Sequence, residues 1–223
     1  MRKQYDIAIC MPCFGRPERT RRAIESIMAQ TVNNWEAFII GDCCPDFENM
    51  MAENRSLGAG SWETIADQAG NKIHLFNLPE HKGGFGYFIR NYAIVNNRSK
   101  LLVFLDNDDI ILPNHFERCI ANMKEYGSPA LLLQASYCKF NDRLRIPFVI
   151  GFGYIGHSEM VINCEAVRSS RAVIEQGPNY GHDWELIQNI IKACGSVVTV
   201  TQETVKPTYL VMGAGDLREK EVD

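Results

Sequence analysis

The sequence has no long hydrophobic run, and this absence bears on where the protein resides. No apolar stretch among its 223 residues approaches the roughly 18–20 residues that cross a bilayer. The amino-terminal segment becomes polar again at Arg16 and contains no apolar signal-peptide core of normal length. We therefore expect a cytoplasmic protein without a transmembrane segment.

An excess of positive charge is also missing. The chain has 23 Lys and Arg against 27 Asp and Glu, which gives a formal net charge of −4 at pH 7. Because nucleic-acid phosphates call for a basic surface, we expect no nucleic-acid partner. The hydrophobic content of 46% is ordinary for a globular protein, and the chain has no low-complexity segment or internal repeat. Its length fits one domain over residues 1–223.

The eight cysteines lack the regular spacing of a disulfide or zinc framework. They are scattered along the chain, and several lie inside apolar runs, where a free thiol behaves as a small hydrophobe. Cys10-x-x-Cys13 together with Cys43-Cys44 is the only arrangement suited to zinc. The composition favours reduced thiols that pack in the core.

Short apolar runs alternate with segments of helical period, which is typical of an α/β domain. The pattern predicts strands at Asp6–Met11, Trp35–Gly41, Lys72–Leu78, Leu101–Leu105, Ala130–Ser136 and Val197–Thr201. It predicts helices at Pro17–Gln30, Gly84–Asn96, Pro113–Tyr126 and Trp184–Cys194. The pattern is weak over residues 137–180, assigns no structure to residues 43–71, and predicts a frayed tail after Gly213.

Polar side chains follow several of these strands. Pro12-Cys13-Phe14 follows the first, Asp42 the second, and the run from Asp106 to Asp109 the fourth. Because ligands bind beyond the carboxyl ends of the strands in open α/β sheets, these residues are candidates for a binding site.

The acidic run has the clearest chemistry. Three carboxylates within four residues repel one another unless a cation neutralises them. Asp106 and Asp108 are spaced so that both can reach one Mg²⁺ or Mn²⁺. These ions take oxygen ligands, usually from protein carboxylates and substrate phosphates together. The alternative is a solvated loop in which Asp109 or Asn114 caps the next helix.

Four blocks in order resemble the family 2 glycosyltransferases, which have the GT-A fold. They are the opening strand with its Pro12 turn, the helix end Ser26–Thr31 (S-I-x-x-Q-T), the segment Arg90–Ile94 (R-N-x-A-I) and Phe104–Asp109 (F-L-D-x-D-D). They cover about residues 5–115. The family's usual acidic pair after the second strand is here Asp42-Cys43, so only its first member is present.

The resemblance implies a single GT-A type domain. Its Rossmann-like, mostly parallel sheet would be flanked by helices and joined by a small second sheet on the acceptor side. About residues 1–115 would bind the nucleotide sugar and about 116–215 the acceptor. The implied activity is metal-dependent, inverting transfer from a nucleotide diphosphate sugar, with a UDP-sugar favoured. The acceptor would be a hydroxyl of a glycan or of a lipid-linked or protein-linked sugar. The oligomeric state stays open.

The resemblance also assigns roles to residues. Pro12, Cys13 and Phe14 would line the base pocket, Asp42 would bind the base, Lys82-Gly83-Gly84 would close over the nucleotide, and Asn107 would face the ribose. Asp106 and Asp108 would bind Mn²⁺ or Mg²⁺ on the donor diphosphate. For Asp42 the alternative is a turn or cap. For Arg90 it is an ion pair with a helix-surface acid, and for Asn91 support of the metal loop.

The catalytic base is expected at the start of a late helix, where the family often carries Glu-Asp. The matching pair here is His182-Asp183, which puts Asp183 in the base position. The alternatives are that Asp183 caps the helix or that Glu185 is the base. His157 and Glu159 are candidates for the sugar or acceptor pocket, against a surface loop. Trp184 is a candidate for stacking on a sugar, against tying its helix to the core.

Two other functions are compatible with an α/β fold of this kind. A nucleotidyltransferase that makes nucleotide sugars usually has a Gly-rich loop after the first strand, whereas this chain has a single glycine there, Gly15. A non-catalytic sugar-nucleotide-binding domain is the second, and the carboxylates Asp106, Asp108 and Asp183 argue against it.

Overall fold

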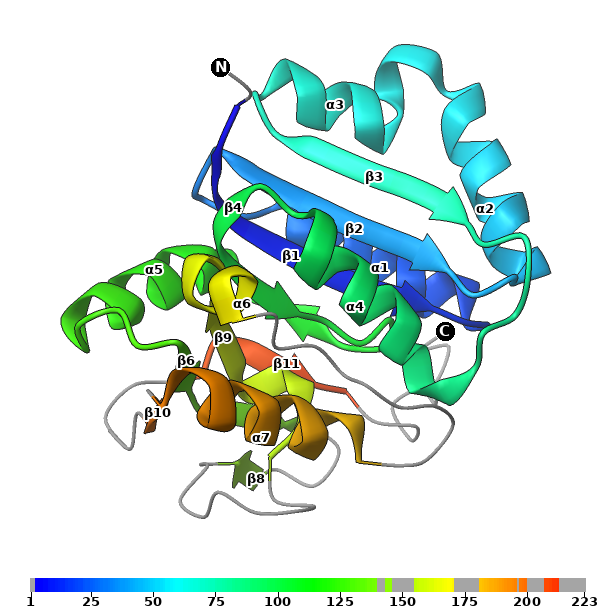
Figure 1. The fold of residues 1–223 in the computed structure, drawn as a ribbon. Coiled ribbons are helices and arrows are strands. Elements are labelled where there is room, and N and C mark those ends of the chain that lie inside the picture. Colours follow the sequence, from blue (N-terminus) through cyan, green and yellow to red (C-terminus); the bar gives the residue numbers. More distant parts are fainter. Residues whose placement is uncertain are drawn as a thin grey trace.

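A seven-stranded sheet organises the protein (Figure 1). The computed structural model describes residues 3–139, 143–145, 155–170, 181–195, 197–199 and 207–212. The strand order is β10-β6-β9-β4-β1-β2-β3. The strands are β1 (Tyr5–Cys13), β2 (Trp35–Gly41), β3 (Lys72–Asn77), β4 (Ser99–Phe104), β6 (Leu131–Leu133), β9 (Met160–Asn163) and β10 (Val197–Thr199).

This sheet is mostly parallel. β1 pairs in parallel with β2 and β4, and β2 pairs in parallel with β3. Only β9 runs antiparallel to its neighbours β4 and β6 among the strands described. The carboxyl ends of β1, β2 and β4 therefore meet at one edge, where the candidate site residues begin.

A smaller sheet lies beside the first. Its order is β5-β11-β7-β8, with β5 (Ile110–Ile111), β11 (Tyr209–Val211), β7 (Ser136–Cys138) and β8 (Arg143–Arg145). β5 follows the acidic run directly, and β11 pairs with it. This pairing brings the chain near residue 209 to the loop that follows β4. The two sheets confirm the predicted fold class.

Helices cover both faces of the main sheet (Figure 1). Because β1 is buried on both sides, its residues alternate between two cores. Ile7, Ile9 and Met11 pack with α1 (Pro17–Met28), α2 (Pro45–Ser56), α3 (Trp62–Gln68) and α5 (His115–Glu125). Ala8 and Cys10 pack with α4 (Tyr87–Asn96), α6 (Cys164–Ser170) and α7 (His182–Cys194).

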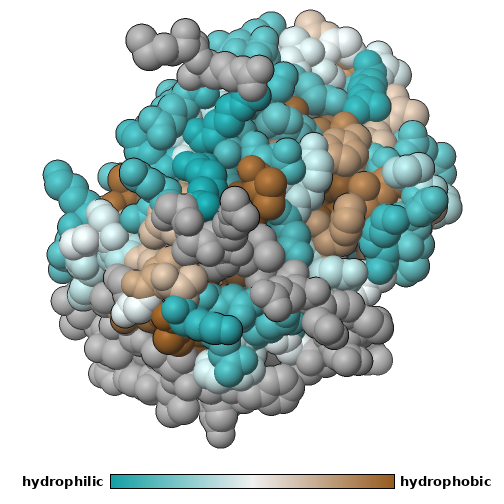
Figure 2. All heavy atoms as spheres, viewed as in Figure 1, coloured by the Kyte–Doolittle hydropathy of each residue, from teal (hydrophilic) through white to brown (hydrophobic). Residues whose placement is uncertain are grey.

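An aromatic cluster lies beside α4 on the second of these faces. The Phe38 ring stacks on His74 with centroids 4.4 Å apart, and the Tyr92 ring meets Phe38 and Phe76 edge-on. Figure 2 shows hydrophobic residues gathered on the β2–β3 side of this face, with hydrophilic residues beside them.

The predicted elements are largely confirmed, with three corrections. Residues 43–71 contain α2 and α3, which the pattern did not show. The predicted strand Ala130–Ser136 divides into β6 and β7, which belong to different sheets. The last helix begins at His182 rather than at Trp184. The tail after Gly213 lies outside the described residues.

The cysteines are free thiols, and most of them are buried, as packing residues would be. Within the described residues no group of three His, Cys, Asp or Glu side chains is arranged to hold a metal. No described helix combines the length and the apolar character needed to cross a membrane.

The end of β2 allows a direct test of the packing. A Cβ on Gly41 would overlap Asn77 Oδ1 and the Phe47 ring, whereas a Cβ on Gly60 would meet nothing nearer than Leu57 Cβ at 3.6 Å. We expect Gly41→Ala to lower the free energy of unfolding by about 1–3 kcal/mol, because Phe47 is buried in the core and Asn77 is held by hydrogen bonds to the Cys44 backbone. Gly60→Ala should change it by less than about 0.5 kcal/mol. Urea unfolding of both variants measures this, and equal effects would contradict the packing described.

Candidate functional site

A cavity of about 630 Å³ opens beyond the carboxyl ends of β1, β2 and β4. Its wall contains most of the residues that the sequence proposed for the site: Pro12, Cys13, Phe14, Asp42, Gly84, Asp106, Asn107, Asp108 and Asp183. Lys82 and Glu159, which the sequence also proposed, are not among the described lining residues. The wall also contains residues that the sequence did not single out for a site, among them Arg16, His81 and Arg145. Side chains from both predicted halves of the chain therefore face one space.

Asp42 organises the loop that follows β3. Its side chain is buried, and its two oxygens accept hydrogen bonds from the backbone N–H groups of Lys82 (2.7 Å) and Gly83 (2.8 Å). His81 Nδ1 lies 3.1 Å from Asp42 Oδ2. Asp42 thus fixes the Lys82–Gly84 loop at the cavity wall, and its predicted contact with the base stays a prediction.

Two rings stand at the mouth of the cavity beside this loop. Phe14 is 59% exposed, and its centroid lies 5.1 Å from that of His81. The neighbouring wall is closely packed, because Gly86, at φ 79°, approaches so near that a Cβ would overlap the Pro12 ring. The amino-terminal end of α4 is therefore held directly against the carboxyl end of β1.

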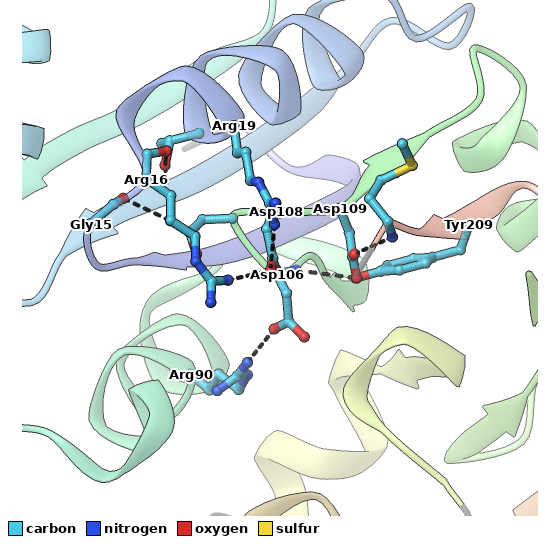
Figure 3. A network of polar contacts seen from close by, with 11 residues as sticks. Gly15, Arg16, Arg19, Arg90, Asp106, Asp108, Asp109 and Tyr209 are labelled. Carbon is cyan, nitrogen blue, oxygen red and sulfur yellow. Dashed lines mark hydrogen bonds and ion pairs between the residues drawn. The ribbon is translucent and has the colours of Figure 1, made fainter. Parts of the chain in front are cut away.

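The carboxylates of the acidic loop are paired with arginines (Figure 3). Asp106 Oδ1 lies 2.8 Å from Arg90 Nη2. Asp108 Oδ2 forms an ion pair with Arg16 and lies 3.5 Å from Arg19 Nη1. Arg90 therefore pairs with the site loop, and the alternative of a helix-surface acid was wrong.

Asn107 forms hydrogen bonds on the side of α1. Its Nδ2 donates to Gly15 O (3.2 Å) and to Thr20 Oγ1 (2.9 Å), which ties the acidic loop to the start of α1. Asn107 also lines the cavity. The predicted ribose contact stays a prediction.

Asp109 is not a helix cap, and this expectation was wrong. Its Oδ2 accepts a hydrogen bond from the Tyr209 hydroxyl (3.0 Å) and its Oδ1 accepts one from Met212 N (2.8 Å). The same hydroxyl accepts a hydrogen bond from Asp106 N at 3.1 Å. Asn114 is the N-cap residue of the following helix, but its side chain makes no capping hydrogen bond. Burial, followed by the nearby Asp106 charge, raises the pKa of Asp109 to about 7.

The donor set of the acidic loop fits a divalent ion that is shared with a phosphate ligand. The ion pairs described above engage one oxygen of Asp106 and one of Asp108. Mg²⁺ typically binds one or two carboxylates together with substrate phosphates. Because the described residues offer no group of three His, Cys, Asp or Glu ligands, such an ion would take its remaining ligands from phosphate oxygens and water.

Asp183 lies in the first turn of α7 and lines the cavity. The N-cap of that helix is Gly181 (φ 115°), so the alternative that Asp183 is the cap was wrong. Trp184 N donates to Asp183 Oδ1 at 2.7 Å. Burial raises the pKa of Asp183 above its usual value. A carboxylate of raised pKa in a cavity suits a general base.

Two histidines flank this region, of which His182 is buried and His157 is half-buried. The His182 ring stacks on Tyr87 with centroids 5.2 Å apart, and the His157 ring meets Phe104 edge-on at 5.1 Å. Burial lowers the pKa of both imidazoles, so both are neutral at pH 7. His157 lines the cavity, and its predicted place in the sugar or acceptor pocket stays a prediction.

The other candidates on this side have supporting positions. Glu159 is 1% exposed and accepts hydrogen bonds from Ser136, Ser158 and Gly156 N. It supports the loop beneath the cavity, so neither predicted position, in the pocket wall or in a surface loop, was right. Trp184 packs against the core formed with α4 and α6, as its alternative role required. Glu185 is not among the described residues that line the cavity.

The fold and the site together define a class. A mostly parallel sheet, a small second sheet and an acidic loop at the carboxyl ends of the strands are the features of a GT-A glycosyltransferase. The crystal structure of S. aureus TarS 1–349 superposes with a TM-score of 0.69 at 14% identity, covering 95% of this chain and 62% of that one. The mannosyltransferase PcManGT from Pyrobaculum calidifontis, in complex with GDP-Man and Mn²⁺, gives 0.61 at 12% identity and covers 97% and 59%.

The chain belongs to glycosyl transferase family 2, whose model matches residues 8–152. An uncharacterized glycosyltransferase of Rickettsia bellii is 28% identical over 131 residues, which are 59% of this chain and 17% of the relative. The UDP-Glc:alpha-D-GlcNAc-diphosphoundecaprenol beta-1,3-glucosyltransferase WfgD of Escherichia coli is 26% identical over 119 residues, 53% and 41% of the two chains. The matched segments thus cover less than half the length of each relative. The predicted family and enzyme class are confirmed, and the match does not support a nucleotidyltransferase.

The raised pKa of Asp109 gives a prediction for stability. Between about pH 4 and pH 7 the folded protein keeps a proton on Asp109 that the unfolded chain has lost, so the free energy of unfolding falls as pH rises through this window. We expect Asp109→Asn to remove on the order of 1–3 kcal/mol of that fall. Urea unfolding at pH 5 and pH 7.5, with EDTA and without nucleotide, measures the difference.

The matched control is Asp67→Asn, which changes an exposed aspartate on α3. It should leave the difference between the two pH values as in the wild type. An Asp109→Asn variant with the same pH dependence as the wild type would show that Asp109 is ionised in the folded protein at pH 5.

Proposed function

We propose that the chain is a metal-dependent, inverting glycosyltransferase that uses a nucleotide diphosphate sugar, with a UDP-sugar favoured. Its acceptor would be a hydroxyl of a glycan or of a lipid-linked or protein-linked sugar. The observation that carries this proposal is that the acidic loop Asp106–Asp109 and the carboxylate of Asp183 border one cavity at the carboxyl ends of the strands. The loop that would bind the leaving diphosphate and the carboxylate that would act as catalytic base thus line the same cavity.

The compared structures support a nucleotide-sugar donor. TarS has been crystallised with UDP-GlcNAc, and that complex superposes on this chain with a TM-score of 0.65 at 14% identity. The printed name of WfgD specifies UDP-Glc as donor and a diphosphoundecaprenol-linked sugar as acceptor. In this chain the nucleobase would enter between Phe14 and the Lys82–Gly84 loop that Asp42 fixes. Asn107 would then lie near the ribose and Gly84 beside the nucleotide.

The donor phosphates would lie at the acidic loop. Asp106 and Asp108 would hold Mn²⁺ or Mg²⁺, which supplies charge neutralisation for the departing nucleoside diphosphate. Arg90 is 5% exposed, and its ion pair with Asp106 and hydrogen bond to Phe85 O fix this edge of the site. Because the leaving diphosphate is already stabilised as an anion, the site needs no acid to protonate it.

Asp183 would take the proton from the acceptor hydroxyl. The oxygen of that hydroxyl attacks the anomeric carbon as the bond to the diphosphate oxygen breaks, and the bonding electrons leave with the nucleoside diphosphate. A single displacement of this kind inverts the configuration at the anomeric carbon. Burial raises the pKa of Asp183, which makes its carboxylate a stronger base at neutral pH.

We expect Asp183→Asn to lower kcat for metal-dependent release of nucleoside diphosphate by about 10²–10⁴-fold, because general-base catalysis contributes about this much. The assay measures hydrolysis of UDP-glucose and UDP-GlcNAc with Mn²⁺ and no acceptor, so that water takes the place of the sugar hydroxyl. The affinity of the variant for UDP, measured by calorimetry, should stay as in the wild type.

Glu185→Gln is the matched control, since it neutralises the other carboxylate in the first turn of α7. It should retain activity within a few-fold of the wild type. Full activity in Asp183→Asn would exclude Asp183 as the base. A wild-type protein that binds UDP, GDP or dTDP but hydrolyses none of the corresponding sugar nucleotides would favour a non-catalytic binding domain.

A further inference from the structure

Arg16 occupies an unusual position at the predicted metal ligand Asp108. It is the N-cap residue of α1, with a left-handed backbone (φ 54°), and its guanidinium pairs with Asp108 Oδ2. Arg19, one turn into the same helix, approaches the same oxygen at 3.5 Å. Figure 3 shows both side chains directed at Asp108. Two cations therefore share one carboxylate oxygen.

The two arginines differ in their freedom to move. The Arg19 side chain is 4% exposed, whereas that of Arg16 is 48% exposed and also lines the cavity. An exposed ion pair is worth little, because water solvates the released guanidinium almost as well as the carboxylate does. Arg16 can therefore leave Asp108 at small cost, while Arg19 remains beside it.

A divalent ion at Asp108 would meet repulsion from these guanidinium groups. The repulsion falls if Arg16 moves away, and a diphosphate within the same cavity offers it an anion of higher charge. The planar guanidinium also matches phosphate oxygens in a two-point contact. The same carboxylate can thus be neutralised by Arg16 or by a metal ion, but poorly by both.

We propose that Arg16 is an exchangeable counter-ion of Asp108. It neutralises this carboxylate while no ligand is bound, and it transfers to the donor diphosphate when the carboxylate binds a divalent ion. The exchange rests on the proposed function, since it requires that the donor phosphates lie at the acidic loop.

The exchange makes the metal ion and the nucleotide bind cooperatively. The ion alone must displace Arg16 into water, whereas the ion together with a diphosphate leaves Arg16 paired. By linkage, each ligand then raises the affinity for the other by the same factor. Loss of the guanidinium should strengthen metal binding without nucleotide and weaken this coupling.

The test measures Mn²⁺ binding by electron paramagnetic resonance of free Mn²⁺, with and without a saturating nucleotide. The nucleotide is UDP, or GDP if UDP does not raise the melting temperature of the wild-type protein. We expect Arg16→Gln to tighten Mn²⁺ binding without nucleotide by about three- to tenfold. The ion then no longer has to displace an exposed ion pair at Asp108, and it is no longer repelled by the Arg16 guanidinium. It should also reduce the factor by which the nucleotide strengthens Mn²⁺ binding. Arg16→Lys, which keeps the charge, should stay near the wild type.

Arg21→Gln is the matched control, because it removes the same charge from α1 at a side chain that pairs with Glu53. It should change neither quantity. If Arg16→Gln binds Mn²⁺ with wild-type affinity and coupling, the exchange is overturned while the proposed function stands. If the wild type binds nucleotide but no Mn²⁺ in its presence, the metal dependence in the proposed function fails, and the exchange fails with it.

Discussion

The neutralisation of the acidic loop after β4 is the interaction on which the site depends. Carboxylates that close together at the end of an apolar strand would repel one another and the helix ends around them. Arginines from two helices on opposite faces of the sheet neutralise Asp106 and Asp108. They are Arg16 and Arg19 from α1 and Arg90 from α4. These ion pairs join both cores to the loop, so the position of the carboxylates is set by the whole main sheet.

The smaller sheet contributes the remaining constraint. Tyr209 on β11 accepts a hydrogen bond from Asp106 N and donates one to Asp109. Since the Tyr209 side chain is fully enclosed, the loop is fixed at the base by an uncharged contact and at the rim by ion pairs. Of the three arginines only Arg16 has a half-exposed side chain, whereas those of Arg19 and Arg90 are buried, which separates the arginine that can move from the two that hold the loop in place.

Local patterns in the sequence were enough for β1 to β4 and for the identity of the acidic residues, whereas β5, β8, β9 and β11 were not predicted. The apolar run Leu101–Leu105 specifies β4, and the aspartates that follow it mark the site. Helix α2 was missed because a polar residue, Asn54, is buried on its inner face, where it binds Glu63 and Trp62 N. The partners of the aspartates were missed for another reason. Arg16 and Tyr209 lie about a hundred residues away from them, and no local spacing encodes such contacts.

The proposed function depends on where a metal ion and a nucleotide bind. Its most direct test is a crystal structure with Mn²⁺ and UDP, in which anomalous scattering locates the ion. We expect one strong peak that joins the Asp106–Asp108 loop to the diphosphate, with the Arg16 guanidinium turned from Asp108 to a phosphate oxygen. A nucleotide bound in the cavity with its diphosphate remote from the acidic loop, or an ion at other ligands, would contradict it.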